Sequence, residues 1–112
     1  EAKSLNEIGI DRAISEHVNK LSFLASNCNI DGIVCAPSEI LIVRKKLGIK
    51  FKIVTPGIRP TNNLGDDQKR ISSAQSAIKD GSDYIVIGRP ITDSKYPKKV
   101  LEDLSESIYS VC

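Results

Sequence analysis

The sequence contains few aromatic residues. It contains no Trp, two Phe and three Tyr, so its core must be built from Ile, Val, Leu and Ala. This composition favours a sheet of β-branched residues covered by aliphatic helices. No apolar run approaches the roughly 18–20 residues that span a bilayer, and the first ten residues lack the basic start and apolar core of a signal peptide. We therefore expect a cytoplasmic chain that has no membrane segment.

An excess of charge of one sign is also lacking. The 16 basic and 14 acidic residues give a net charge of +2, too small to predict a nucleic-acid partner. The sequence has an odd number of cysteines, Cys28, Cys35 and Cys112. They lack the C-x-x-C spacing of metal or redox sites. We expect free thiols in a reducing compartment. The chain has no initiator Met, which indicates a fragment, a processed product or a trimmed chain.

The apolar pattern alternates between the helical and the strand period. It predicts helices over residues 14–25 (with Asp11 as the N-cap), 37–47 (ended by Gly48), from Ser72 or Ser73 to Gly81, and 97–110. Uniformly apolar runs predict strands near 32–36, 51–55 and 84–87. Residues 56–70 hold two Pro, two Gly, two Asn and two Asp, and we expect a long loop there.

This order of elements predicts a single α/β domain over residues 1–112, with a parallel sheet and right-handed crossovers. Two closures fit the pattern, an open doubly wound sheet and a (β/α)₈ TIM barrel. Three strands are too few to complete either. Because a full barrel takes about 250 residues, 112 residues would be somewhat under half of one.

Ligands bind at the carboxyl ends of the strands in both architectures. Residues 35–38, 55–60 and 88–90 would lie there. Gly88 would let an anion approach the backbone, and Arg89 offers a planar fork of donors suited to phosphate. Arg59, stiffened by the following Pro60, could hold the same anion. The alternative is that both arginines are ordinary surface residues. Asp66 and Asp67 have no further ligand at metal-binding spacing, so we expect no metal site.

Three blocks of sequence carry a family resemblance. They are T-P-G-I-R-P at residues 55–60, G-D-D-Q-K-R at 65–70 and I-G-R-P-I at 87–91. In this order and spacing they resemble the C-terminal part of bacterial orotidine 5′-phosphate decarboxylases, and the likeness runs through nearly all of the chain.

The resemblance implies the C-terminal part of a (β/α)₈ TIM barrel, with the three strands as its sixth, seventh and eighth. It implies a cofactor-free and metal-free enzyme, a homodimer when complete, that converts orotidine 5′-phosphate to UMP in pyrimidine biosynthesis. By motif match, the substrate-binding positions would be Arg59, Gln68, Gly88, Arg89 and Pro56. Gln68 and Arg89 would contact the 5′-phosphate, the Gly88 N–H would assist, and Pro56 would pack near the pyrimidine.

The family's catalytic D-x-K-x-x-D pattern does not occur in this sequence, so we expect no catalytic residue in the chain. The leading hypothesis is a part of the decarboxylase that needs the missing N-terminal half of the barrel. A second is another phosphate-binding barrel, such as a sugar-phosphate decarboxylase or an aldolase-like synthase. A third is a non-catalytic remnant or interaction module.

Overall fold

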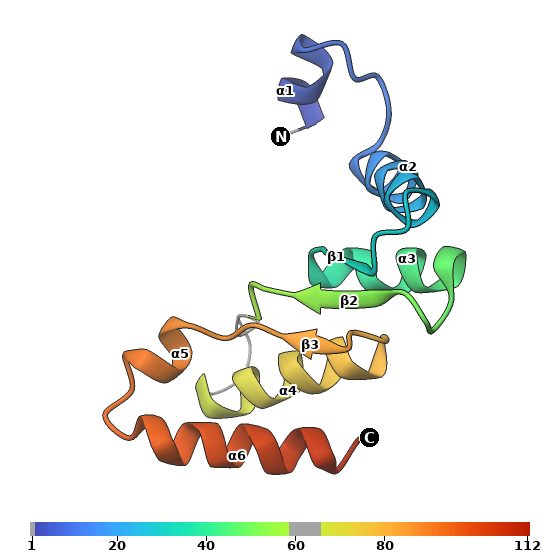
Figure 1. Ribbon diagram of the computed structural model, residues 1–112. Helices are drawn as coiled ribbons and strands as arrows, with labels where there is room; N and C mark the ends of the chain where they lie inside the picture. Colours follow the sequence, from blue (N-terminus) through green and yellow to red (C-terminus); the bar gives the residue numbers. More distant parts are fainter. Residues whose placement is uncertain (1, 59–65) are drawn as a thin grey trace.

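The computed structural model describes residues 2–58 and 66–112 (Figure 1). Three short strands alternate with helices along the chain, as the apolar pattern predicts. The strands are β1 (Gly32–Val34), β2 (Lys52–Thr55) and β3 (Tyr84–Ile85). The helices are α1 (Ala2–Glu7), α2 (Ile14–Asn27), the 3₁₀ turn η1 (Pro37–Glu39), α3 (Ile40–Leu47), α4 (Asp66–Lys79), α5 (Arg89–Thr92) and α6 (Pro97–Tyr109).

The three strands form one parallel sheet in the order β1-β2-β3, which confirms the predicted topology. In register, Ile33 lies beside Ile53 and Thr55 beside Ile85. Gly32 pairs with Lys52, and a Cβ added to Gly32 would lie 2.2 Å from the Lys52 carbonyl oxygen. Only glycine therefore allows β1 to approach β2 this closely.

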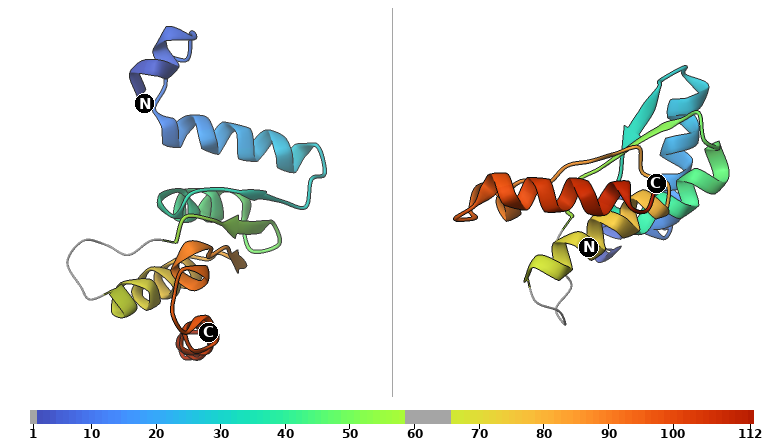
Figure 2. Two further views of the ribbon diagram at one scale, coloured as in Figure 1. Left: turned by 90° about the vertical axis from the view of Figure 1, so that its left-hand side faces the viewer. Right: turned by 90° about the horizontal axis from the view of Figure 1, so that it is seen from below.

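Helices cover one face of the sheet. In the right-hand view of Figure 2, α3 and α4 lie on the same side of the strands, and α6 packs against α4. The core between these layers is aliphatic, as the composition predicts. Its most deeply buried members are Ile40, Val43, Ile53, Ala74 and Ala77.

The opposite face of the sheet is open. Val34, Val54 and Tyr84 are neighbours in register, and Val86 follows Tyr84 on the same face. We call these four residues the bare sheet face. Val34 is 69% exposed, Tyr84 60% and Val86 51%. Apolar strand residues normally contact a second layer, so this sheet has the inner surface of a barrel without the strands that would close it.

Two details differ from the expectations. The helix predicted from Ser72 or Ser73 begins at Asp66, so residues 66–70, expected in a loop, belong to this helix. Its first turn, D-D-Q-K-R, is polar on all sides and gives no apolar period, yet acidic residues suit a helix amino terminus and Gln, Lys and Arg favour helix. The helix predicted after Asp11 begins at Ile14, with Ala13 in the N-cap position. Asp11 lies too early to cap it.

Two short helices, α1 and α5, were not predicted, because six and four residues are too few to show an apolar period. α1 stands apart from the sheet (Figure 1). Among the described residues, the structure has no helix with the length and apolar character needed to cross a membrane.

Candidate functional site

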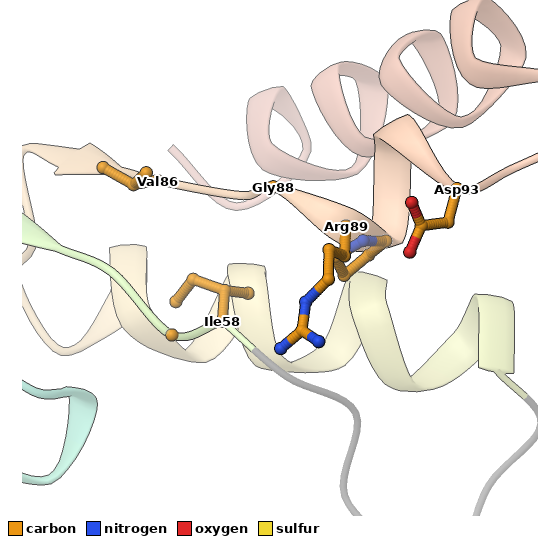
Figure 3. A pocket seen from close by; sticks show the side chains of 7 residues that line it. Ile58, Val86, Gly88, Arg89 and Asp93 are labelled. Carbon is orange, nitrogen blue, oxygen red and sulfur yellow. The ribbon is translucent and has the colours of Figure 1, made fainter.

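A pocket of about 590 Å³ opens at the carboxyl ends of β2 and β3 (Figure 3). Two segments far apart in the sequence build it, one following each strand, because parallel neighbouring strands end at the same edge of the sheet. The lining residues are Gly57, Ile58, Val86, Gly88, Arg89, Pro90 and Asp93. The pocket therefore combines an apolar inner wall with one basic and one acidic side chain.

Gly88 and Arg89 form the polar wall where β3 passes into α5. A Cβ added to Gly88 would meet no atom within 4 Å, so the absence of a side chain leaves open space beside the backbone. The Gly88 N–H has no acceptor among residues 2–58 and 66–112. The Arg89 side chain is exposed and extends past Ile58 in Figure 3, which leaves its guanidinium donors available to a ligand.

The opposite wall follows β2. Gly57 has φ +70°, a conformation that L side chains rarely adopt, and it turns the chain out of the strand. Ile58, only 3% exposed, then anchors the chain against the core. This turn and anchor shape the wall of the pocket that follows β2.

A buried pair of hydroxyl groups joins the two strands below the pocket. Thr55 Oγ1 lies 2.8 Å from Ser82 Oγ, and the Ser82 hydroxyl also lies 2.8 Å from the Tyr84 carbonyl oxygen. Both side chains are almost fully buried. Their hydrogen bonds help to fix the relative height of β2 and β3, and thus the two pocket walls.

At the amino ends of the same strands, Arg44 of α3 gathers several acceptors, and we call this group the Arg44 clasp. Its Nη1 donates to the carbonyl oxygens of Gly48 at 2.7 Å and Phe51 at 2.6 Å, and its Nε donates to Gly81 at 3.1 Å. Its Nη2 lies 2.9 Å from Asp83 Oδ2. The clasp therefore joins α3 to the segments that enter β2 and β3.

Asp83 completes the clasp. Its Oδ2 accepts a hydrogen bond from the Ile53 N–H at 2.8 Å, and Lys52 Nζ lies 3.5 Å from Oδ1. Partial burial raises the pKa of the Asp83 carboxyl, but the Ile53 N–H, Arg44 and Lys52 outweigh this effect and lower the pKa below its ordinary value. Asp83 thus carries its negative charge where it binds β2.

The structure brings two of the five predicted binding residues, Gly88 and Arg89, into the pocket. Pro56 is half-buried beside it and does not line it. Arg59 lies outside the described residues, directly after Ile58. Gln68 falls in the first turn of α4, and its side chain is not among those described.

Residues 35–38 follow the carboxyl end of β1, as expected, but they do not line this pocket. Cys35 is 5% exposed and belongs to the core. Burial raises the pKa of its thiol, the Glu39 carboxylate raises it further, and Arg44 opposes both effects. Because the thiolate is the nucleophilic form, Cys35 is unsuited to catalysis. All three cysteines are free, as expected.

Asp93 is a charged pocket residue that the sequence did not predict. It lies four residues after Arg89, a spacing that places two side chains on the same face of a helix. The one-turn helix α5 was not expected, so this spacing carried no signal. No group of three or more His, Cys, Asp or Glu that could hold a metal ion occurs among the described residues.

Comparison with protein families identifies the origin of this arrangement. Residues 1–104 match the family described as orotidine 5′-phosphate decarboxylase / HUMPS. The chain belongs to this family. The matched residues include both walls of the pocket and the Arg44 clasp, so these features lie within the region that resembles the family.

Individual relatives whose function is curated lead to the same family. The chain is 46% identical over 108 residues to an orotidine 5′-phosphate decarboxylase of Vibrio cholerae, covering 96% of this chain and 47% of the relative. It is 42% identical over 111 residues to that of Actinobacillus succinogenes, covering 99% and 48%. The chain thus spans about half the length of these relatives, as their C-terminal portion.

Solved structures agree on the fold. The orotidine 5′-phosphate decarboxylase of Lactobacillus acidophilus superposes with a TM-score of 0.80 at 30% identity, over 96% of this chain and 44% of that one. The enzyme of Pyrococcus horikoshii superposes at 0.68 and 24% identity, over 90% and 46%, which supports the fold alone. The structure is the C-terminal part of a (β/α)₈ TIM barrel.

Proposed function

We propose that this chain supplies the phosphate-binding half of the active site of an orotidine 5′-phosphate decarboxylase, which forms UMP in pyrimidine biosynthesis. The observation that carries the proposal is the pocket where Gly88 and Arg89 face Gly57 and Ile58, in a chain of this family. A guanidinium and a glycine backbone suit a phosphate, and Val86 and Ile58 suit the organic part of a nucleotide.

Phosphate binding would serve catalysis at a distance. Contacts to a phosphate that does not react can provide the energy that orders the reacting centre. In this proposal Arg89 and Gly88 hold the phosphate together with Arg59 and Gln68, and Pro56 lies toward the pyrimidine. The catalytic Lys and Asp residues come from the part of the barrel that this chain does not contain.

The proposed partner is therefore the N-terminal half of the barrel. Two observations support it. The bare sheet face leaves Val34, Tyr84 and Val86 exposed, and a second apolar cleft of about 290 Å³ opens between β3 and α6, lined in part by Ile85, Ile87 and Leu104. Both surfaces lie where further strands and helices of a barrel would pack. The completed enzyme would be a cytoplasmic homodimer.

A reconstituted barrel tests this proposal. The part of the Vibrio cholerae enzyme that precedes the matched region is co-expressed with this chain, and its own C-terminal part serves as the positive control. We expect a stable complex that decarboxylates orotidine 5′-phosphate, followed by the change in ultraviolet absorbance, and neither half should turn over alone.

Formation of a stable complex without turnover, while the positive control is active, would contradict the proposed activity. Growth of a pyrimidine-requiring strain that lacks this enzyme gives an independent readout. If the reconstituted barrel were inactive on orotidine 5′-phosphate but active on a sugar phosphate, the chain would belong to another phosphate-binding barrel enzyme.

A further inference from the structure

The pocket has a polarity along its length. In Figure 3, Val86 lies at one end, Gly88 and Arg89 in the middle, and Asp93 at the other end, with Ile58 on the facing wall. The lining thus passes from apolar to basic to acidic as the chain runs outward from β3. A ligand with an organic end, a phosphate and a further group would meet these three zones in turn.

Asp93 and Arg89 share one face of α5 and do not neutralise each other. The Asp93 N–H donates to the Arg89 carbonyl oxygen at 2.9 Å, which fixes the two residues one turn apart. No ion pair joins their side chains, since the pairs within 4.0 Å among the described residues involve Arg44, Lys52, Lys98 and Lys99. Within the described part of the chain, the side-chain hydrogen bond to this carboxylate comes from the Thr92 hydroxyl, 3.5 Å from Oδ1.

We propose that Asp93 is a specificity-determining residue that restricts this pocket to phosphomonoesters and disfavours nucleoside diphosphates. This inference rests on the proposed function, since it takes the Gly88 and Arg89 zone as the phosphate site. With the organic end over Val86 and Ile58 and the first phosphate at Arg89, a second phosphoryl group points toward Asp93. Its added negative charge then faces a carboxylate.

The size of the effect follows from Coulomb repulsion near a protein surface. One added charge a few ångströms from a partly solvated carboxylate lowers affinity by roughly three- to tenfold. The first phosphate gains from Arg89 more than it loses to the more distant Asp93. The discrimination is electrostatic, so it decreases as ionic strength rises.

Titrations of this chain with uridine, UMP and UDP test the inference. The shifts of the Gly88 and Arg89 amide resonances report binding, and the whole spectrum reports folding. In the unmodified chain we expect UMP to bind more tightly than UDP. Asp93→Asn should raise UDP affinity by about three- to tenfold relative to UMP, whereas Asp93→Glu should retain the preference for UMP. Glu106→Gln removes the same charge from an exposed site on α6 and should leave the ratio unchanged.

The outcomes separate this inference from the function on which it rests. If UMP binds more tightly than uridine but the ratio of UDP to UMP affinity is the same in Asp93→Asn, the role of Asp93 is wrong and the phosphate site stands. If Glu106→Gln changes the ratio as much as Asp93→Asn does, net charge is responsible, and the inference is overturned. If UMP and UDP bind no better than uridine, the phosphate site itself is wrong, and both proposals fail.

Discussion

Arg89 is the residue from which a phosphate contact would gain most, because its exposed guanidinium lies beside the open space at Gly88. Charged hydrogen bonds are worth roughly 1.5–3 kcal/mol each. In the reconstituted barrel, Arg89→Ala should lower kcat/KM by about tenfold to a hundredfold or more. Arg89→Lys should recover only part of this loss, since an ammonium group lacks the planar fork.

A substrate without the 5′-phosphate provides the control for this prediction. The Arg89 variants should turn over such a nucleoside almost as well as the unmodified protein does, because the lost contact has nothing to hold. An equally large loss with the nucleoside would assign Arg89 to the fold and not to the phosphate.

Gly88 tests whether the open space is functional. The added Cβ of Gly88→Ala meets no atom within 4 Å, so the free energy of unfolding should change by less than about 1 kcal/mol. UMP affinity should nevertheless decrease, because the Cβ occupies the space beside the backbone N–H. Amide resonances and thermal unfolding measure the two quantities separately.

Gly57→Ala is the matched comparison from the opposite wall. Its φ of +70° makes any side chain strained, so this variant should lose roughly 1–2 kcal/mol of stability. If Gly88→Ala destabilised the chain as much and left UMP affinity unchanged, Gly88 would be needed for the backbone and not for the ligand.

Among the elements, β2 and β3 depend on the Arg44 clasp for their alignment. Removal of the Asp83 charge leaves Arg44, whose side chain is 16% exposed, without its ion pair. We expect Asp83→Asn to lower the free energy of unfolding by about 1–2 kcal/mol. For a chain of this size that corresponds to a decrease of several degrees in Tm.

The same carboxyl predicts a pH dependence. The folded pKa of Asp83 is below its ordinary value, so the unfolded chain binds the proton first as pH falls. The stabilisation is complete above about pH 4, the unfolded pKa, and is lost as pH falls further through the folded pKa. Denaturant titrations from neutral to acidic pH should show a smaller loss in Asp83→Asn. Asp103→Asn, which alters an exposed pair with Lys99, should retain the full loss.

The sequence predicts an element well when that element has a clear pattern of apolar residues. Uniform apolar runs located all three strands, and Gly48 marked the end of α3. The start of α4 was missed because its first turn has no apolar residue before Ile71. In the site, Gly88 and Arg89 could be predicted because they directly follow the apolar run at residues 84–87. Asp93 could not, because its position depends on the single turn of α5.

At the scale of the whole molecule, the bare sheet face should control association. Uncovered strand edges and apolar faces pair with other chains, so the isolated chain should self-associate with increasing concentration in sedimentation experiments. Val34→Thr with Tyr84→Gln should reduce this association. Tyr109→Gln, which alters an even more exposed residue on α6, should have no effect.

The N-terminal half of the Vibrio cholerae enzyme should suppress the same association, because it would cover the bare sheet face. A monomer of the isolated chain that unfolds sharply, and at a temperature independent of concentration, would show that this face needs no partner.

The Arg44 clasp and the pocket lie at opposite ends of the same strands, and this separation bears on how the protein can change over generations. Substitutions at the outer end of the pocket, such as at Asp93, leave the contacts of Arg44 and Asp83 intact. Single substitutions at this end can therefore change which ligand is preferred without destabilising the fold. For an engineer, the outer end of the pocket is the place to randomise, and the clasp is the place to hold constant.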